Sequence, residues 1–114
     1  MPLPLDGGAA ETIAARHLES LGYRILARNV KSKRGELDIV ARDGRTLCFV
    51  EVRLRKSSSL AFASIDPRKQ RSLARAAEHY LLANRLSSMP CRFDVVAIAN
   101  DGQPTLIRDA FGSV

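Results

Sequence analysis

The chain contains no tryptophan, only two cysteines and only two histidines among its 114 residues. Cys48 and Cys91 lie far apart, each in a segment predicted to be a strand, and lack the spacing of metal ligands, which argues against a zinc site and predicts reduced, buried thiols. His17 and His79 fall in separate helical segments with no nearby Cys or second His. We therefore assign no chemistry to the cysteines or the histidines.

Long apolar runs are also missing, and no stretch approaches the length that spans a bilayer. The first residues, MPLPLDGG, have neither the basic segment nor the apolar stretch of a signal peptide. We therefore expect a cytoplasmic protein without a membrane partner. A length of 114 residues, 46% of them hydrophobic, predicts a single domain over residues 1–114, with the Pro- and Gly-bearing residues 1–8 flexible.

Acidic residues are fewer than basic ones, and the formal net charge of the chain is +6 with a pI near 10.0. Arginine outnumbers lysine fourteen to four, and guanidinium groups suit bidentate contacts with phosphate. A basic domain is attracted to polyanions whatever its fold. Nucleic acid, most simply DNA, is the leading candidate, with a ribosome, a membrane surface or an acidic partner as alternatives.

The stretch GELDIVARDGRTLCFVEVRLR, residues 35–55, predicts a β-hairpin that carries acids in apolar strands. Asp43-Gly44 is a strong hairpin signal between two runs of strand-forming residues. If these two residues form the loop, Arg42 faces Arg45, and every other cross-strand pair follows from that register. The pairing predicts Asp38 opposite Phe49 and Glu36 opposite Glu51.

Alternation along both strands then points five charged side chains to one face of the sheet. These are Glu36, Asp38, Glu51, Arg53 and Arg55. Like charges on one face of a sheet destabilise it, and a hard divalent cation bound by oxygen ligands would compensate them. The alternative is structural, because Glu51 could pair with Arg53, Arg55 or another arginine. The prediction also requires a loop with an even number of residues, since an odd loop would put Asp38 and Glu51 on opposite faces.

The remaining elements are predicted from hydrophobic period and from turn and cap signals. In order they are a helix at 9–21, a strand at 23–30, a basic turn at 31–34, the hairpin, a polar flexible connection at 56–63, a helix from Pro67 to about Arg85, and strands at 92–98 and 105–108. The long helical segment before strand 92–98 predicts a right-handed crossover and a parallel pair of strands. The fold class is therefore α/β with a mixed sheet.

Asp66-Pro67 predicts an N-cap followed by proline at the first helical position. Cationic residues crowd the first turn of this helix, where the helix dipole favours acids. An anion bound at this end would relieve the conflict. We expect phosphate contacts from exposed cations there, in the basic turn and beside the hairpin. These residues are Arg28, Lys31, Lys33, Arg34, Arg55, Arg68 and Arg71.

The motifs GELDIVARD and FVEVRLR, in this layout, resemble the YraN-like family of small uncharacterised bacterial proteins. The resemblance extends to GAAETIAARHLESLGYRILARN near the start, the helix DPRKQRSLARAAEHYL and the strand RFDVVAI, and so covers nearly the whole chain. That family is similar to the restriction-endonuclease-like superfamily, which includes archaeal Holliday-junction resolvases. The resemblance implies an αβββαβ core, a mixed central sheet flanked by helices.

The resemblance also implies a Mg²⁺ site, with Mn²⁺ as an alternative ion. Asp38 takes the place of the first metal-binding acid of the superfamily, and Glu51 takes the place of the acid in its acid-x-lysine motif. The Val52 carbonyl would complete the metal site, and Glu11 resembles a helix-one glutamate of the resolvase branch. Glu36, in the GE-x-D pattern, would be a further ligand or a neighbour of one.

One position departs from the motif, because Arg53 stands where lysine is expected. Arginine can stabilise charge on a phosphate but stays protonated, so it cannot manage the proton of the attacking water. Lys69 is the candidate replacement.

Two functions follow from the resemblance. One is a metal-dependent DNA endonuclease, for which resolvase-like relatives suggest a homodimer. The other is a nucleic-acid-binding module that keeps the nuclease fold with impaired catalysis. An interaction domain whose partner is a protein is a third alternative.

Overall fold

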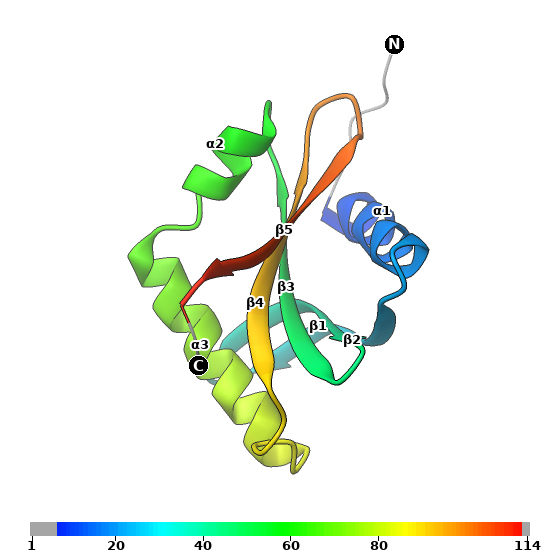
Figure 1. Cartoon of the computed structure of the whole chain (residues 1–114). Coiled ribbons are helices and arrows are strands. Elements are labelled where there is room, and N and C mark those ends of the chain that lie inside the picture. Colours follow the sequence, from blue (N-terminus) through cyan, green and yellow to red (C-terminus); the bar gives the residue numbers. More distant parts are fainter. Residues whose placement is uncertain (1–6, 113–114) are drawn as a thin grey trace.

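The computed structural model describes residues 7–112 as an α/β arrangement of eight helices and strands. In chain order they are α1 (Gly7–Ser20), β1 (Arg24–Ser32), β2 (Gly35–Asp43), β3 (Thr46–Leu54), α2 (Ser58–Ala63), α3 (Pro67–Ala83), β4 (Cys91–Ile98) and β5 (Pro104–Phe111). The sheet lies between α1 and α3 (Figure 1). The predicted fold class, α/β with a mixed sheet flanked by helices, is confirmed.

The five strands form one sheet in the order β1-β2-β3-β4-β5. β3 and β4 run parallel, and every other neighbouring pair is antiparallel. A parallel pair needs a crossover connection, which α2 and α3 provide between β3 and β4. The parallel pair predicted from the long helical segment is therefore confirmed.

Two apolar clusters hold the layers together, one on each face of the sheet. The α1 face gathers residues of the helix, β2, β3 and β4, among them Ala14, Leu18, Ile39, Val50 and Ile98. The α3 face gathers Val40, Leu47, Phe49, Leu73, Ala77, Phe93 and others. Because helices cover both faces, β2, β3 and β4 are apolar on both sides.

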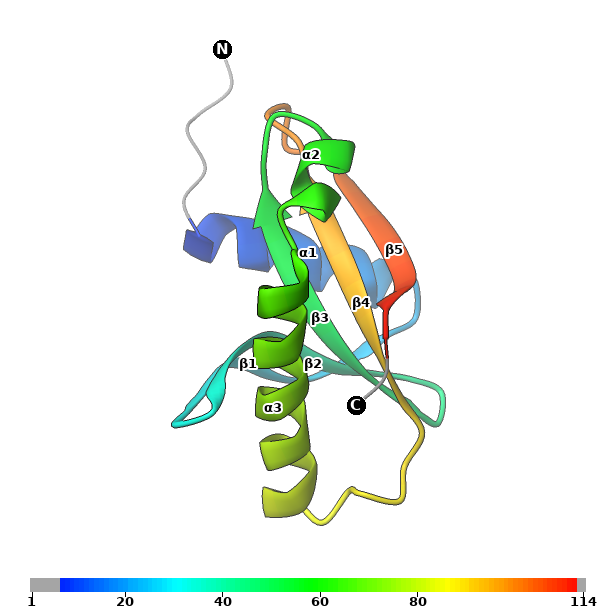
Figure 2. The same cartoon turned by 90° about the vertical axis from the view of Figure 1, so that its left-hand side faces the viewer.

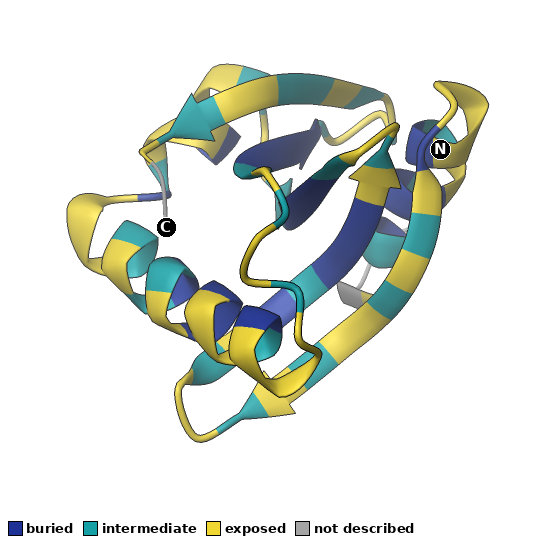
Figure 3. Ribbon diagram, turned by 60° about the horizontal axis from the view of Figure 1, so that its bottom comes forward, coloured by how far each residue is buried: buried dark blue, intermediate teal, exposed yellow. Residues whose placement is uncertain are grey.

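Burial falls from the central strands toward the edges of the sheet (Figure 3). β3 and β4 are mostly buried, whereas β1 and β5 alternate between half-buried and exposed residues. No helix within residues 7–112 is long and apolar enough to cross a lipid bilayer.

The predicted register of the β2–β3 hairpin is wrong by one loop position. Asp43 pairs with Thr46, so the loop is Gly44-Arg45 and not Asp43-Gly44. Gly44 has a φ of 61°, and Arg45 is not among the described residues with positive φ, a pattern that suits a type II′ turn with glycine first. The loop still has two residues, and the faces to which the side chains point are unchanged.

The corrected register also changes the predicted partners of the acids. The paired residues run as far as Ile39 and Val50, and continuing this register puts Asp38 opposite Glu51 in place of Phe49. Glu36 is not opposite Glu51 as predicted, because the same continued register puts Glu36 opposite Arg53. On the other edge of β2, Glu36 pairs with Lys31 of β1.

Two further predictions need correction. The connection predicted to be flexible contains α2, which begins after Ser57, whose hydroxyl accepts a hydrogen bond from the backbone N–H of Leu60 at 3.3 Å. A serine cap stabilises such a short helix by satisfying an otherwise unpaired N–H. Of the segment 1–8 predicted to be flexible, residues 1–6 lie outside the described residues, and Gly7 and Gly8 already belong to α1.

Candidate active site

Two of the acids predicted to form a site, Glu11 and Asp38, line one open pocket near the end of β3, which we call the acid pocket, and Glu36 and Glu51 are not among its lining residues. Its volume is about 330 Å³, and its walls come from α1, β2, β3 and the residue that follows β3. The lining residues are Ala10, Glu11, Asp38, Val52, Arg53, Leu54 and Arg55. In Figure 2 the end of β3 lies between α1 and the connection from α2 to α3. Tertiary packing therefore brings Glu11 to the hairpin acids.

Asp38 lies just beyond the last paired residues of β2 and β3. Its Oδ2 accepts a hydrogen bond from the backbone N–H of Val52 at 2.9 Å. At this point a side-chain oxygen takes the place of the backbone carbonyl that would accept this bond in a continued β-ladder. The N–H and C=O of one strand residue point to the same edge. The Val52 carbonyl therefore also lies on the edge that faces β2, as a metal ligand at this position would require.

Glu51 is the most deeply buried acid of the pocket region, with only 5% of its surface exposed. Its Oε2 lies 2.9 Å from the Arg53 guanidinium and 3.5 Å from the Lys69 Nζ. Burial, together with the hydrogen bond and the charge of Asp38, raises the pKa of Glu51 to about 8, although the charges of Lys69 and Arg53 act to lower it. Burial outweighs the two ion pairs, so Glu51 keeps its proton near neutral pH.

Lys69 reaches this acid because of how α3 begins. Pro67 occupies the start of the helix, and the Asp66 side chain accepts a hydrogen bond from the backbone N–H of Lys69 at 2.8 Å. This is the predicted Asp-Pro cap. The cap orients the first turn of α3 so that Lys69 contacts Glu51.

Glu11 carries a polar atom that no other group within residues 7–112 satisfies. Its Oε1 is buried without a hydrogen-bond partner within the described part of the chain, as is the Nε of Arg53. Burial, and then the charge of Asp38, raises the pKa of Glu11, while the charge of Arg28 lowers it. A buried, unpartnered acid oxygen costs free energy unless a ligand or water satisfies it.

The donors of this pocket fit a hard divalent cation, although they do not form a complete ligand cage. Residues 7–112 contain no group of three His, Cys, Asp or Glu side chains placed to hold a metal ion. Mg²⁺ is commonly bound by one or two carboxylates, with water and substrate phosphate as the other ligands. Asp38 and Glu51 supply two carboxyl groups, and the unpartnered oxygen of Glu11 is nearby.

Comparison with known sequences identifies the family. A sequence profile described as "Uncharacterised protein family UPF0102" matches residues 10–98. The chain belongs to this family. Relatives named UPF0102 protein cover nearly its whole length: that of Pseudomonas fluorescens is 50% identical over 95% of this chain and 94% of its own, and that of Stutzerimonas stutzeri is 47% identical over 95% of both. The UPF0102 protein of Chlorobium limicola is 45% identical over 83% of this chain and 75% of its own.

The predicted phosphate-contacting cations of this UPF0102 chain are all exposed. Arg55 lines the acid pocket, and Arg28 donates a hydrogen bond to the Thr12 hydroxyl at 3.2 Å, which joins β1 to α1. Arg68 and Arg71 lie in the first half of α3, near Lys69. Lys31, Lys33 and Arg34 lie at the turn between β1 and β2.

A second polar cluster, at the other end of β4, was missed by the sequence analysis. Asp94 is fully buried and accepts hydrogen bonds from Arg92 Nε, the Tyr23 hydroxyl and the backbone N–H of Asp109, each at 2.9 Å. An aspartate within the apolar run FDVVAI is the signal that could have found it. Its hydrogen bonds are satisfied, so we assign the cluster a structural role in the UPF0102 fold.

Both cysteines of this UPF0102 chain are free, as predicted, but Cys91 is half-buried where a buried thiol was predicted. Cys48 is buried, and burial raises the pKa of its thiol to about 12. Such a thiol is protonated at neutral pH and is a poor nucleophile.

Proposed function

We propose that this protein binds nucleic acid and hydrolyses phosphodiester bonds in DNA with Mg²⁺, or with Mn²⁺ in its place. The observation that carries the proposal is the meeting of Asp38 and Glu51 beside two cations, Arg53 and Lys69. Titratable groups whose pKa values are shifted by burial and by neighbouring charges concentrate at functional sites. The two acids provide ligands for a metal cation, and the net charge of +6 attracts a polyanion such as DNA to the same protein.

Asp38, Glu51 and the Val52 carbonyl would hold the ion, and Glu11 would satisfy its unpartnered oxygen there. Glu36 contributes through charge alone, because it is exposed and pairs with Lys31 across β1 and β2. When bound, Mg²⁺ supplies a Lewis acid for the phosphate and lowers the pKa of the attacking water.

Arg53 and Lys69 divide the task that one lysine has in the related motif. The Arg53 guanidinium stays protonated and stabilises negative charge that develops on the phosphate. Lys69 is only partly exposed, with 36% of its side chain accessible, and an ammonium group can both neutralise charge and exchange a proton. We therefore assign the transition-state charge to Arg53 and proton exchange to Lys69.

The exposed cations provide the nucleic-acid surface of this proposal. Arg55 borders the acid pocket, and Arg68 and Arg71 lie near Lys69 at the start of α3. Contacts of this kind depend on charge and not on base sequence. Affinity for DNA should therefore fall steeply with salt concentration.

The experiment that tests this function is calorimetric titration of Mg²⁺ and Mn²⁺ into the wild type and Asp38→Ala, followed by addition of branched and single-stranded DNA to the same samples. The expected result is metal binding and cleavage by the wild type, both lost in Asp38→Ala. Glu19→Ala removes an exposed acid of α1 and serves as the control. Cleavage that survives Asp38→Ala would overturn the assignment.

A second function is favoured by one observation, the 2.9 Å ion pair between Glu51 and Arg53. An arginine that permanently neutralises the acid could make the metal unnecessary and leave a nucleic-acid-binding module with the nuclease fold. DNA binding without metal binding or cleavage would establish this function in place of the first.

Three further parts of the proposal come from the resemblance and from the sequence. They are membership of the restriction-endonuclease-like superfamily, a homodimer that would cut two strands of a junction, and a location in the cytoplasm. Sedimentation of the protein with and without a DNA junction tests the dimer directly.

A further inference from the structure

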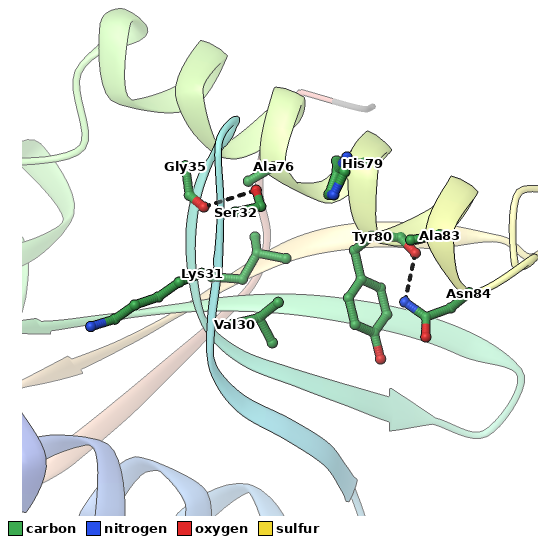
Figure 4. Close-up of a pocket in the computed structure, with 10 residues that line it drawn as sticks. Val30, Lys31, Ser32, Gly35, Ala76, His79, Tyr80, Ala83 and Asn84 are labelled. Atoms are coloured by element: carbon green, nitrogen blue, oxygen red, sulfur yellow. Dashed lines mark hydrogen bonds between the residues drawn. The ribbon is translucent and has the colours of Figure 1, made fainter.

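A second hollow lies between α3 and the turn that joins β1 to β2 (Figure 4). Its volume is about 160 Å³. We call it the α3 pocket, and its lining residues are Val30, Lys31, Ser32, Gly35, Leu37, Ala76, His79, Tyr80, Ala83 and Asn84. Figure 4 shows Tyr80 and Asn84 extending from α3 opposite Val30.

The α3 pocket combines apolar walls with polar atoms that are open to solvent. Asn84 is exposed and Tyr80 is half-buried, and neither side chain is among the buried unpartnered groups of residues 7–112. The Tyr80 hydroxyl and the side-chain oxygen of Asn84 are therefore accessible to a ligand. The side-chain nitrogen of Asn84 donates to the Tyr80 carbonyl at 2.9 Å, which leaves its oxygen free to accept. A ligand with a flat apolar body and a polar edge would satisfy both features.

A cationic hollow adjoins the α3 pocket, and His79 lines both. The lining residues of this cationic hollow include Arg34 from the β1–β2 turn, Arg75 from α3 and one acid, Glu78. Its volume is about 270 Å³. Two guanidinium groups outweigh one carboxylate, and guanidinium binds phosphate with two parallel hydrogen bonds. The charge therefore favours an anionic group next to whatever occupies the α3 pocket.

We infer that the α3 pocket takes one unpaired base of a nucleic-acid strand and that Arg34 and Arg75 contact the adjacent phosphates. A nucleobase is flat and apolar on its faces and polar at its edge. In a duplex its edge is paired and its faces are stacked, so only a single-stranded or extruded base can enter. The inference rests on the proposed nucleic-acid binding, and it names a substrate with a single-stranded segment.

The position of the pocket suits a strand that also crosses the acid site. Lys69 and His79 are ten residues apart on α3, which corresponds to about 15 Å at the rise of an α-helix. A strand spans this distance with about four nucleotides at ~3.4 Å each. One DNA strand could thus contact both sites at once.

The test measures fluorescence anisotropy of a labelled oligothymidylate, an abasic strand of equal length and a duplex, at several salt concentrations. Ala83 is exposed on α3, so Ala83→Leu fills the mouth of the pocket at little cost to the fold, and Ala83→Ser is the matched control. A double variant, Arg34→Ala with Arg75→Ala, removes the phosphate contacts. Arg16→Ala with Arg24→Ala changes two exposed arginines outside both hollows and controls for the two lost charges. Thermal unfolding verifies that each variant is folded.

We expect Ala83→Leu to weaken binding of oligothymidylate about tenfold, as loss of one base contact does, and to leave the abasic strand and the duplex unaffected. The double arginine variant should weaken both single strands and reduce the slope of log affinity against log salt by about 1.4, or ~0.7 for each phosphate. Equal binding of normal and abasic strands, or no effect of Ala83→Leu, would overturn the base pocket and leave DNA binding intact. Failure of the wild type to bind any of the three DNAs would instead refute the proposed function, and the inference with it.

Discussion

Asp38 accepts a hydrogen bond from the backbone N–H of Val52 at 2.9 Å, where the paired residues of β2 and β3 end. The carboxylate thus has a structural contact as well as a proposed metal-binding role. Asparagine retains an oxygen that can accept the bond but removes the charge, whereas alanine removes both.

We therefore expect Asp38→Asn to abolish metal binding while the free energy of unfolding stays near that of the wild type. Asp38→Ala should lose about 1 kcal/mol of stability in addition. Urea unfolding and metal calorimetry on the two variants separate the roles. Metal binding by Asp38→Asn equal to that of the wild type would refute the role of Asp38 as a ligand.

Arg53 stands where the related motif has lysine, and we expect that restoring the lysine increases DNA cleavage. Arg53→Lys places a side chain that can exchange a proton beside Glu51, and we expect a rise of at least about tenfold in DNA cleavage. Cleavage rates measured over a range of pH check this, with Arg16→Lys at an exposed arginine of α1 as the control.

Lys69→Arg makes the opposite change, because it keeps the positive charge near Glu51 but removes the group that can lose a proton. We expect slower cleavage by this variant, with unchanged affinity for DNA. Equal cleavage by wild type and Lys69→Arg would exclude Lys69 from proton exchange.

Glu51 should make the folded protein sensitive to alkaline pH. The folded state keeps the Glu51 proton up to about pH 8, whereas the ordinary pKa of a glutamic acid is 4.5. The folded state therefore binds more protons between these values, and its free energy of unfolding falls as pH rises through this window. Urea unfolding at about pH 5 and about pH 8.5 measures the fall.

Glu51→Gln removes the titrating group and should flatten this dependence, because a neutral amide has no charge to bury. Glu19→Gln changes an exposed glutamate of α1 and should leave the dependence as it is. The same fall in Glu51→Gln as in the wild type would assign the pH dependence to other groups.

Gly35 is required where β2 begins against α3. It has a φ of 137°, and a Cβ atom there would lie 3.2 Å from the Ser72 hydroxyl oxygen and 3.6 Å from the Ala76 Cβ. Gly35→Ala should destabilise the protein by about 1–2 kcal/mol, because it adds backbone strain and crowding. Gly112→Ala is the matched control, since a Cβ at Gly112 would meet no atom within 4 Å. Equal unfolding midpoints for the two variants would contradict this account.

Asp94 should be among the most costly residues to remove. Asp94→Ala removes the buried partner of Arg92, which keeps its 2.8 Å ion pair with Asp43, and leaves the Tyr23 hydroxyl and the Asp109 backbone N–H without their acceptor. Each buried group left unsatisfied costs about 1–3 kcal/mol, so we expect a loss of at least about 2 kcal/mol. Asp109→Asn keeps the backbone N–H that bonds to Asp94, and asparagine tolerates the φ of 50° at this position, so this variant serves as the control. Thermal unfolding of the two variants compares the costs.

Local signals predicted much of the fold correctly. The Asp66-Pro67 cap, the parallel pairing of β3 with β4 and the common face of the hairpin acids all follow from short-range rules on caps, crossovers and alternation. The loop of the hairpin was not predicted correctly, because Asp43-Gly44 and Gly44-Arg45 are both acceptable two-residue loops. The face was correct because either loop has an even number of residues.

The sequence by itself determined the α/β class, the basic surface and the presence of acids in apolar strands, since these depend on composition and on periods of a few residues. Only the tertiary structure decided that Glu11 of α1 and Lys69 of α3 meet the hairpin acids, and that burial outweighs the ion pairs of Glu51. Distances between elements and the exclusion of water arise from packing α1 and α3 on opposite faces of the sheet. No local pattern of residues encodes them.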